Sequence, residues 1–405
     1  MDTITDESPR LPYESILAPR GSIHSGQRKL LIALLDALVD HVPAGSPAVV
    51  VYVGAAPGVN IGFVTDLFPT VRFDLFDPNP FDARLVAKAA AEPERIQLFS
   101  QYFTDEDTAR YAAAALAEPI IFISDIRGGD GVNDIRQMSP ETSNRYVDDD
   151  MRMQERWVRK IRPAAFSLKF RLPYPAPGKD AAPYPYLGGR IRIQSWPGSA
   201  SSETRLVGTA ADAAAPPVDY NVRDYEDRCF FHNFVTRVFA RYSYDGIAPG
   251  GLAVGEPGDA PATLADNADR AAYGAAARFA AATAPGVAPA RGLCRCFDCA
   301  NEVDTWHRYF ARPDAVWFEL PRGDFAGAIA ASVTAVGSLG ATAGLQIKKN
   351  GHGLHPGAPA LDAIGDIWQA AAPAWRHDQA MYKNTKQRRA AGIGQQSKSM
   401  NEPGG

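Results

Sequence analysis

The sequence predicts an α/β fold, a doubly wound and mostly parallel sheet of about seven strands with helices on both faces. The first observation behind this prediction is a regular alternation of short apolar runs with amphipathic helical patterns between residues 29 and 170. The second is that the runs at 47–53 and 119–124 are apolar almost throughout, as in parallel strands covered on both faces. The third is the length of 405 residues, which suits one large α/β domain with additions.

The individual elements follow one another as such a fold requires. The first helix is expected at 29–42, where apolar residues recur at helical spacing after the helix cap Ser25. The apolar runs expected to form strands lie at 47–53, 71–76, 95–99, 119–124 and 164–170, and the helical patterns between them lie at 61–68, 80–92, 105–117 and 145–161. Beyond this core, two further strands are expected at 190–194 and 204–209, and an aromatic-rich helix at 224–242.

Composition divides the chain into five segments. An N-terminal arm (1–24) precedes the core of the α/β domain (25–244). A Gly/Ala/Pro-rich insertion (245–292) separates this core from the C-terminal part of the same domain (293–345). The last segment, 346–405, is rich in Gly, Lys and Gln towards its end, and we expect that end to be largely disordered.

The bulk composition excludes several classes of protein. Hydrophobic residues make up 46% and charged residues 22% of the chain, as in an ordinary globular protein, and no apolar run reaches the roughly 18 residues of a membrane span. The acidic N-terminus predicts no secretory signal, and four cysteines favour a reducing compartment over a disulfide scaffold. A net charge of −4 argues against a uniformly basic surface that coats nucleic acid, but it permits a local basic groove.

Three features at strand ends predict a site for a single adenosine-type ligand such as S-adenosylmethionine. Gly54-x-x-Pro57-Gly58 follows the first strand and opens a helix, and glycine lets a ligand approach the backbone closely. Asp77 ends the second strand, where a carboxylate can accept hydrogen bonds from ribose hydroxyls, and Asp125 ends the fourth. The loop lacks the spacing of a dinucleotide fingerprint and the Gly-Lys-Ser of a nucleoside triphosphate site.

Charged residues near the ends of two apolar strands are the strongest candidates for chemistry. Lys169 lies within Ala-Phe-Ser-Leu-Lys-Phe, where a solvated lysine is hard to place. Asp125 ends the run Pro-Ile-Ile-Phe-Ile-Ser in the same unusual way. A lysine on an amphipathic helix, such as Lys29, is by itself most simply a surface residue, and Glu203 alone carries no information.

Several stretches together resemble the poxvirus cap-specific mRNA 2′-O-methyltransferase family, whose members also serve as the small, processivity subunit of the viral poly(A) polymerase. The resemblance covers roughly residues 13–320, interrupted by the insertion. It is carried by Ser-Gly-Gln-Arg-Lys-Leu-Leu at 25–31, Val-Val-Tyr-Val-Gly-Ala-Ala-Pro-Gly at 50–58, Ile-Phe-Ile-Ser-Asp-Ile-Arg at 121–127, Ala-Phe-Ser-Leu-Lys-Phe-Arg at 165–171, Ser-Glu-Thr-Arg-Leu at 202–206, and Tyr225-Glu226. It implies a Rossmann-like class I S-adenosylmethionine methyltransferase that methylates the ribose 2′-hydroxyl of the first transcribed nucleotide.

The resemblance also implies the site residues. Four catalytic positions in the order Lys-Asp-Lys-Glu fall on Lys29, Asp125, Lys169 and Glu203. Contacts to S-adenosylmethionine fall on Gln27, Tyr52, Gly54, Ala55, Gly58, Asp77 and Asp125, and contacts to the methylated guanine of the cap fall on Tyr13, Tyr174 and Glu226. The sequence departs from the family at Asn60 and Asn79 in the cofactor site, changes that the site can tolerate. It also departs at Ala176 and Ala200 in the cap site, which puts the mode of guanine recognition, though not the chemistry, in question.

The chemistry explains why two lysines are needed. A ribose 2′-hydroxyl must lose its proton as it attacks the methyl group, and an ordinary lysine, with a pKa of about 10.4, is protonated and cannot accept it. A neighbouring cation and partial burial both disfavour the charged form, so Lys169 beside Lys29 could become a general base. Asp125 and Glu203 would hold the two amino groups in place, and no metal is required.

The resemblance implies capped mRNA as partner, a viral poly(A) polymerase catalytic subunit as a further candidate partner, and a virus-encoded protein of the host cytoplasm or the virion. One alternative is a ribosomal or other non-cap RNA 2′-O-methyltransferase, which shares the Lys-Asp-Lys-Glu arrangement without a cap pocket. An alternative of another class is a non-catalytic RNA-binding processivity subunit of a poly(A) polymerase.

A cysteine motif near the C-terminal part of the domain allows two interpretations. Cys294, Cys296 and Cys299, with His307 eight residues later, are compatible with thiolate ligation of zinc but match no standard finger. We favour reduced, partly buried cysteines without a metal.

Overall fold

The computed structural model describes residues 3–8, 10, 26–128, 139–174, 182–198, 201–233, 237, 297–317, 320–325, 328–329 and 331–332. The whole of the 245–292 insertion and of the 346–405 tail, and most of the N-terminal arm, therefore lie outside the described residues. The predicted division of the chain into segments stays a prediction. No helix in the described ranges is both long and apolar enough to cross a membrane.

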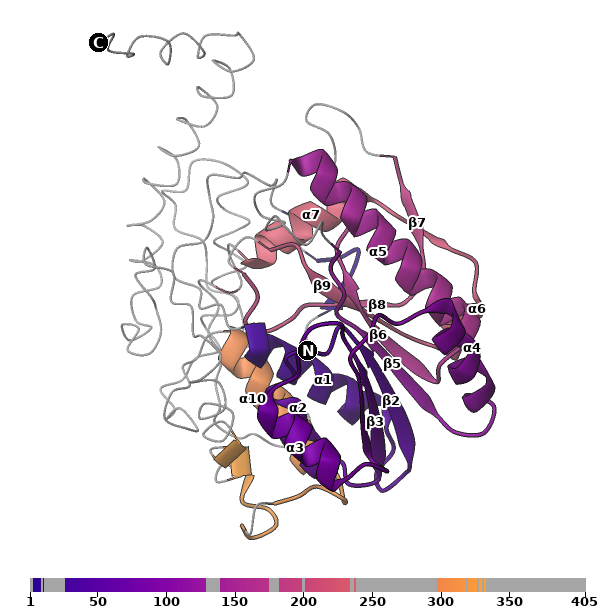
Figure 1. The fold of residues 1–405 in the computed structure, drawn as a ribbon. Helices are drawn as coiled ribbons and strands as arrows, with labels where there is room; N and C mark the ends of the chain where they lie inside the picture. The colour runs from indigo at the N-terminus through magenta and orange to yellow at the C-terminus, as the bar shows by residue number, and fades with distance from the viewer. Residues whose placement is uncertain are drawn as a thin grey trace, which may run out of the picture.

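The described part is built on an eight-stranded sheet (Figure 1), which confirms the predicted doubly wound α/β fold. The strand order is β1-β8-β9-β6-β5-β2-β3-β4. The strands are β1 (Thr3–Ile4), β2 (Ala48–Val53), β3 (Val71–Phe76), β4 (Ile96–Phe99), β5 (Ile120–Ser124), β6 (Ala165–Phe170), β8 (Arg190–Arg192) and β9 (Thr204–Thr209). From β4 to β6 all neighbours are parallel, whereas β6–β9, β9–β8 and β8–β1 are antiparallel.

Two groups of helices cover the two faces of the sheet (Figure 1). One group packs α1 against α2 and α10, and α2 against α3, while the other packs α5 against α4 and α6. The helices are α1 (Gly26–His41), α2 (Ile61–Leu67), α3 (Ala83–Ala91), α4 (Asp105–Ala114), α5 (Pro140–Ile161), α6 (Ala210–Ala214), α7 (Val222–Phe231) and α10 (Phe297–Phe310). The central strands β2 and β5 are fully buried between these layers, as their unbroken apolar runs require.

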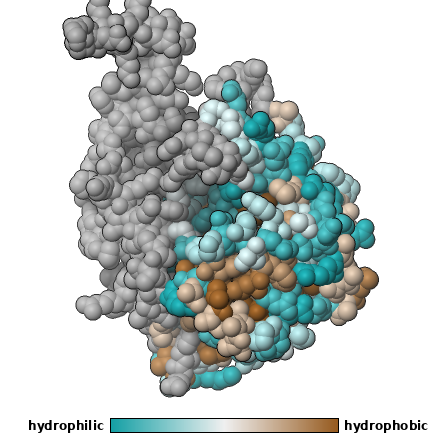
Figure 2. All heavy atoms as spheres, viewed as in Figure 1, coloured by the Kyte–Doolittle hydropathy of each residue, from teal (hydrophilic) through white to brown (hydrophobic). Residues whose placement is uncertain are grey.

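The observed elements confirm most of the predicted ones and add short ones. Helix α5 begins earlier than expected, because Ser139 caps it by accepting a hydrogen bond from the Thr142 N–H. The unpredicted strands are short: β1 pairs with β8, and β7 (Tyr184–Tyr186) pairs with β10 (Val218–Tyr220) in a separate two-stranded sheet. On the face drawn in Figure 2, the described part has a mostly hydrophilic surface, with an apolar patch near α2 and α3.

The strand order reverses between β2 and β5, and this position fixes the site. From β2 the chain runs outward through β3 and β4, and it then crosses back to β5 and β6 on the other side. Ligands of open α/β sheets bind beyond the carboxyl ends of the strands at such a switch point. Gly54 follows β2 there and Asp125 follows β5, so the predicted cofactor loop and a predicted catalytic carboxylate meet at this point.

Candidate active site

The loop from β2 to α2 is shaped by two glycines with positive φ. Gly54 has a φ of +83°, and a Cβ at this position would lie 2.9 Å from the backbone carbon of Asp125. Gly58 has a φ of +67°, and a Cβ there would lie 2.8 Å from the Leu85 side chain. Both positions therefore need glycine for conformation and for space. The loop passes directly beside the end of β5.

Asp77 at the end of β3 fastens this loop. Its Oδ2 accepts a hydrogen bond from the Ala56 N–H at 3.0 Å, and its Oδ1 accepts from the backbone and side-chain amides of Asn79 at 2.8 and 2.9 Å. A carboxylate offers about four acceptor positions. Among the contacts of the described residues, Oδ2 has one position left for a ligand hydroxyl.

A pocket opens between α1, the end of β2 and α2. Four of the seven residues predicted to contact the cofactor line it, namely Gln27, Tyr52, Ala55 and Gly58. Asn60 also lines it and donates from Nδ2 to the Gln27 carbonyl oxygen at 3.0 Å. The Asn60 Oδ1 atom is buried without a hydrogen-bond partner in the described structure. A buried acceptor of this kind suits a ligand that carries N–H donors.

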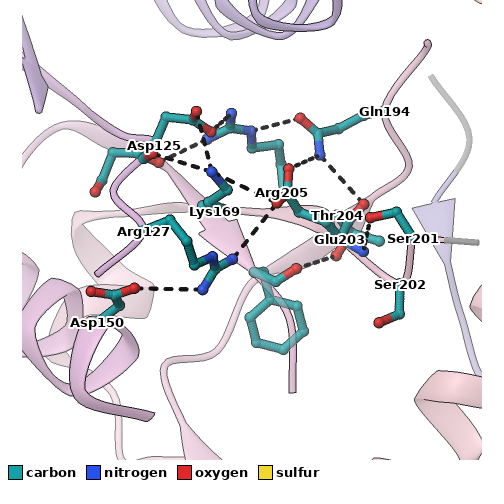
Figure 3. Close-up of polar contacts among 12 residues, drawn as sticks. Asp125, Arg127, Asp150, Lys169, Gln194, Ser201, Ser202, Glu203, Thr204 and Arg205 are labelled. Atoms are coloured by element: carbon teal, nitrogen blue, oxygen red, sulfur yellow. Dashed lines mark hydrogen bonds and ion pairs between the residues drawn. The ribbon is translucent and has the colours of Figure 1, made fainter. Parts of the chain in front are cut away.

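The structure brings the four predicted catalytic side chains together from four separate segments. Lys29 on α1 pairs through Nζ with Oε1 of Glu203, and Lys169 on β6 lies with Nζ 3.7 Å from the other carboxylate oxygen, Oε2. Lys169 Nζ also lies 3.3 Å from Oδ2 of Asp125 and 3.2 Å from its carbonyl oxygen (Figure 3). The two amino groups therefore share one carboxylate.

Burial and charge shift the protonation of this cluster. Lys169 is 9% exposed, and this burial lowers the pKa of its ammonium below the usual value, with Lys29 and Arg127 acting in the same direction against Asp125 and Glu203. Burial alone would raise the pKa of Glu203, but the charges of Lys169 and Lys29 outweigh it and hold that pKa well below the usual range. The neighbouring cations lower the pKa of Asp125 in the same way.

Two polar residues that the sequence analysis assigned no role also belong to the cluster. Arg205 on β9 pairs with Asp125 Oδ1 and donates to the Ser124 carbonyl oxygen at 2.7 Å. Its Nε donates to Gln194 Oε1 at 3.0 Å, and Gln194 Nε2 lies 3.4 Å from Glu203 Oε1 (Figure 3). The available signal was an arginine within a buried strand, the same kind of signal that pointed to Lys169.

An ion pair between Arg127 and Asp150 flanks the cluster on the side of α5. Arg127 lies 3.6 Å from Asp150 and 3.7 Å from Glu203 (Figure 3). The Gly128 N–H donates to Asp150 at 2.7 Å, so this carboxylate of α5 holds the loop after β5 as well as the guanidinium.

The predicted cap-binding residues are placed in part. The Tyr174 ring lies under the Arg171 guanidinium at 4.1 Å, and its backbone N–H donates to Asn144 at 2.9 Å. Glu226 on α7 is buried, and this burial raises the pKa of its carboxyl to about 7, while the Arg171 charge acts in the opposite direction. Arg171 is thus a neighbour of both residues. Tyr13, Ala176 and Ala200 lie outside the described residues, and the assignment of a cap site stays a prediction.

The cysteine motif is also placed in part. Cys299 is a buried cysteine on α10. Cys294 and Cys296 lie outside the described residues, so the choice between reduced cysteines and a zinc site stays a prediction.

Comparisons with known proteins show which proteins the chain is similar to. Residues 13–247, more than half of the chain, match the family described as poly(A) polymerase regulatory subunit. The cap-specific mRNA (nucleoside-2′-O-)-methyltransferases of Myxoma virus strains Lausanne and Uriarra are each 30% identical over 215 residues, which is 51% of this chain. The match spans 59% of the length of these relatives. A solved structure of human methyltransferase-like protein 13 in complex with SAH covers 52% of this chain and 92% of that chain, at 13% identity and a TM-score of 0.26.

Proposed function

The chain belongs to the poly(A) polymerase regulatory subunit family, and we propose that it is an S-adenosylmethionine-dependent mRNA cap 2′-O-methyltransferase. The acceptor is the ribose 2′-hydroxyl of the first transcribed nucleotide of capped RNA. The names of the Myxoma virus relatives support this activity. The same relatives support a virus-encoded protein that works in the host cytoplasm or the virion.

One observation carries the proposal: a single carboxylate, Glu203, holds the amino groups of Lys29 and Lys169 beside the end of β5. Neighbouring cations disfavour each other's charge, and burial disfavours the charge of Lys169 further. A lysine in this setting can exist as the free amine near neutral pH, where it can accept a proton.

The residues of the cluster divide the work in this proposal. Lys169 is the general base and takes the proton from the 2′-hydroxyl through Nζ. Asp125 and Glu203 fix the position of Nζ, and Lys29 completes the cluster from α1. A base positioned in this way, which removes the hydroxyl proton in the transition state, accelerates the reaction roughly 10²- to 10⁴-fold.

The cofactor pocket fits the proposed methyl donor. S-adenosylmethionine supplies a methyl group on a sulfonium, a leaving group that needs no metal. Gln27, Tyr52, Gly54, Ala55 and Gly58 would hold it along the pocket and the loop after β2, with Asp77 on the ribose and Asp125 near the methionine part. The unpartnered Oδ1 of Asn60 offers an acceptor inside the same pocket.

Recognition of the cap is assigned to Tyr174 and Glu226, together with Tyr13. A tyrosine ring can stack on the positively charged N7-methylguanine, and a carboxylate can accept hydrogen bonds from the N1/N2 edge of the base. The support is that Arg171, two residues after Lys169, lies over the Tyr174 ring and acts electrostatically on Glu226.

The experiment that tests this function compares methyl transfer to short RNAs of identical sequence with and without an N7-methylguanosine cap. We expect transfer to the 2′-hydroxyl of the first nucleotide of the capped RNA, and transfer to the uncapped RNA that is slower by at least about tenfold. Mass spectrometry of the digested RNA identifies the modified nucleotide. Equal rates on the two RNAs would remove the cap from the proposal and favour a non-cap RNA 2′-O-methyltransferase.

Family membership also favours a second function, that of a processivity subunit for a poly(A) polymerase catalytic subunit. The two functions are compatible, because a polymerase could be bound by a surface away from the Lys169 cluster. A chain that extended poly(A) synthesis by a partner polymerase but methylated no RNA would have only this second function.

A further inference from the structure

Arg205 occupies an unusual position for an arginine. It lies on β9 at 2% exposure, and it is the register partner of Lys169 on the antiparallel strand β6. Directly opposed residues of an antiparallel pair point to the same face of the sheet. Both side chains therefore extend toward Asp125, and both reach it.

The contacts give each carboxylate of the cluster a cation of its own. Asp125 is paired with Arg205 on Oδ1 and with Lys169 on Oδ2 at 3.3 Å. Glu203 is paired with Lys29 on Oε1 and with Lys169 on Oε2 at 3.7 Å. Lys169 is the cation shared between the two carboxylates.

This arrangement decides which group can lose its proton at low cost. A buried carboxylate that loses its partner is an uncompensated buried charge, and this strongly destabilises the folded state. If Lys169 becomes neutral, Asp125 keeps Arg205 and Glu203 keeps Lys29, so neither carboxylate is left unpaired. Arg205 itself cannot serve as a base, because a guanidinium is not deprotonated in proteins.

We propose that Arg205, oriented by Gln194, is a positioning residue that keeps Asp125 charge-paired while Lys169 exists as the free amine. Gln194 accepts from Arg205 Nε and approaches Glu203 through Nε2, so it joins the two carboxylates behind Lys169 (Figure 3). This inference deepens the proposed function and rests on it for the role of Lys169 as base.

The other charged groups that face Lys169 do not replace Arg205. From the loop after β5 come Asp125 and Arg127, from the β9 side Glu203 and Arg205, from α1 Lys29, and from α5 Asp150. Arg127 lies between Asp150 and Glu203, at 3.6 and 3.7 Å. The Asp125 side chain is paired only with Arg205 and Lys169 among the described residues.

The test measures the pKa of Lys169 directly, in the full chain without cofactor or RNA. Lysine labelled with ¹³C at Cε is followed by NMR across a pH titration, and the Lys169 signal is assigned by its loss in Lys169→Arg. Arg205→Gln keeps hydrogen-bond donors but removes the charge, and we expect it to raise the pKa of Lys169 by about one pH unit or more. Arg205→Lys keeps the charge and should leave the pKa of Lys169 close to that of the wild type.

A matched control separates this effect from loss of stability. Arg192 is the register partner of Arg205 on β8 and is also buried, but it pairs with Asp36 and Asp40 of α1. Arg192→Met should reduce stability without moving the pKa of Lys169. If Arg205→Gln does not fold, Gln194→Met removes the partner of Arg205 Nε and should give a smaller rise in the same pKa.

The kinetic readout must agree with the titration. The pH at which methyl transfer reaches half its maximal rate should rise in Arg205→Gln by the same amount as the pKa of Lys169. Each unit of this rise corresponds to a rate at neutral pH that is about tenfold lower. An unchanged pKa of Lys169 in Arg205→Gln would overturn the role of Arg205. Failure of the wild type to methylate RNA, together with a normal shift in that pKa, would count against the proposed function instead.

Discussion

At the scale of single residues, the protein places ionisable groups where burial changes their charge. Lys169 and Glu226 are the two clearest cases, and burial is the largest cause of the pKa shift in each. For the lysine, burial favours the neutral amine that a base requires. For the glutamate, burial favours the neutral acid, so ionisation at the proposed cap site carries a cost.

The raised pKa of Glu226 predicts that the free energy of unfolding depends on pH. Its folded pKa of about 7 lies above the unfolded value, so the folded state binds more protons between these values, and stability is lost as the pH rises through this range. The loss amounts to roughly 3 kcal/mol at most. Glu226→Gln should abolish this component, as measured by urea unfolding at pH 5 and pH 8. The idea fails if the wild type and Glu226→Gln show the same difference between the two pH values.

The local sequence alone predicted catalytic residues only where a charged residue interrupts or ends an apolar strand. Lys169 and Asp125 interrupt or end apolar strands, and this marks them without knowledge of the fold. Lys29 and Glu203 do not lie in such a sequence context, and only the family resemblance predicted them. Arg205 does lie within an apolar strand, but its partner Asp125 is 80 residues away in the sequence. Only the antiparallel register of β9 on β6 shows that the two side chains meet.

At the scale of elements, the loop between β2 and α2 connects the cofactor pocket to the catalytic cluster. Gly54 adopts a positive φ, and the loop lies against the backbone of Asp125. A shift of this loop therefore changes both the pocket and the position of the Asp125 carboxylate, which we propose to be catalytic. The pocket residues Ala55 and Gly58 belong to the same loop.

Gly54→Ala should consequently damage cofactor binding as well as stability. The substitution combines an unfavourable φ with a Cβ at 2.9 Å from the Asp125 backbone, which cannot move away as a flexible side chain could. We expect a loss of more than about 1 kcal/mol in unfolding free energy and at least about tenfold weaker binding of S-adenosylhomocysteine, measured by calorimetry. Gly45→Ala is the matched control, because Gly45 has a φ of +67° with no atom within 4 Å of the added Cβ. Equal effects of the two substitutions would refute the importance of the close approach.

The regular elements were predictable because their hydrophobic periodicity is strong. Strands β3 and β9 match their predicted ranges, and the other strands of the parallel core agree within about one residue. The strands β1, β7 and β10 contain only two or three residues each, too few for an alternation to stand out. Their formation depends on pairing with distant strands, a tertiary effect that local propensity does not contain.

At the scale of the whole molecule, segments far apart in the sequence close around α1, the helix that carries Gln27 and Lys29. Helix α10 packs on α1, and Arg308 of α10 pairs with Asp36 and Asp40. Nearer the middle of α10, Glu302 accepts hydrogen bonds from Arg28 and from the indole of Trp196. Helix α10 therefore supports the helix that brings Lys29 to Glu203.

This long-range assembly explains why a chain with a net charge of −4 can hold a locally cationic site. The carboxylates of Asp125 and Glu203 are surrounded by four cations from distant segments, Lys29, Arg127, Lys169 and Arg205. Charge summed over the sequence says nothing about such a concentration, which depends on the fold. Composition excluded a uniformly basic protein and could not indicate this cluster.

The measurement that tests the central claim most directly is single-turnover methyl transfer to capped RNA by Lys169→Ala, with RNA binding and S-adenosylhomocysteine binding measured on the same preparation. Without an amine at this position, we expect the rate to fall by about 10² or more at neutral pH, while both affinities stay within a few-fold of the wild type. A variant that methylates at the wild-type rate would contradict the assignment of Lys169 as the base. Parallel loss of methyl transfer and RNA binding would contradict it as well.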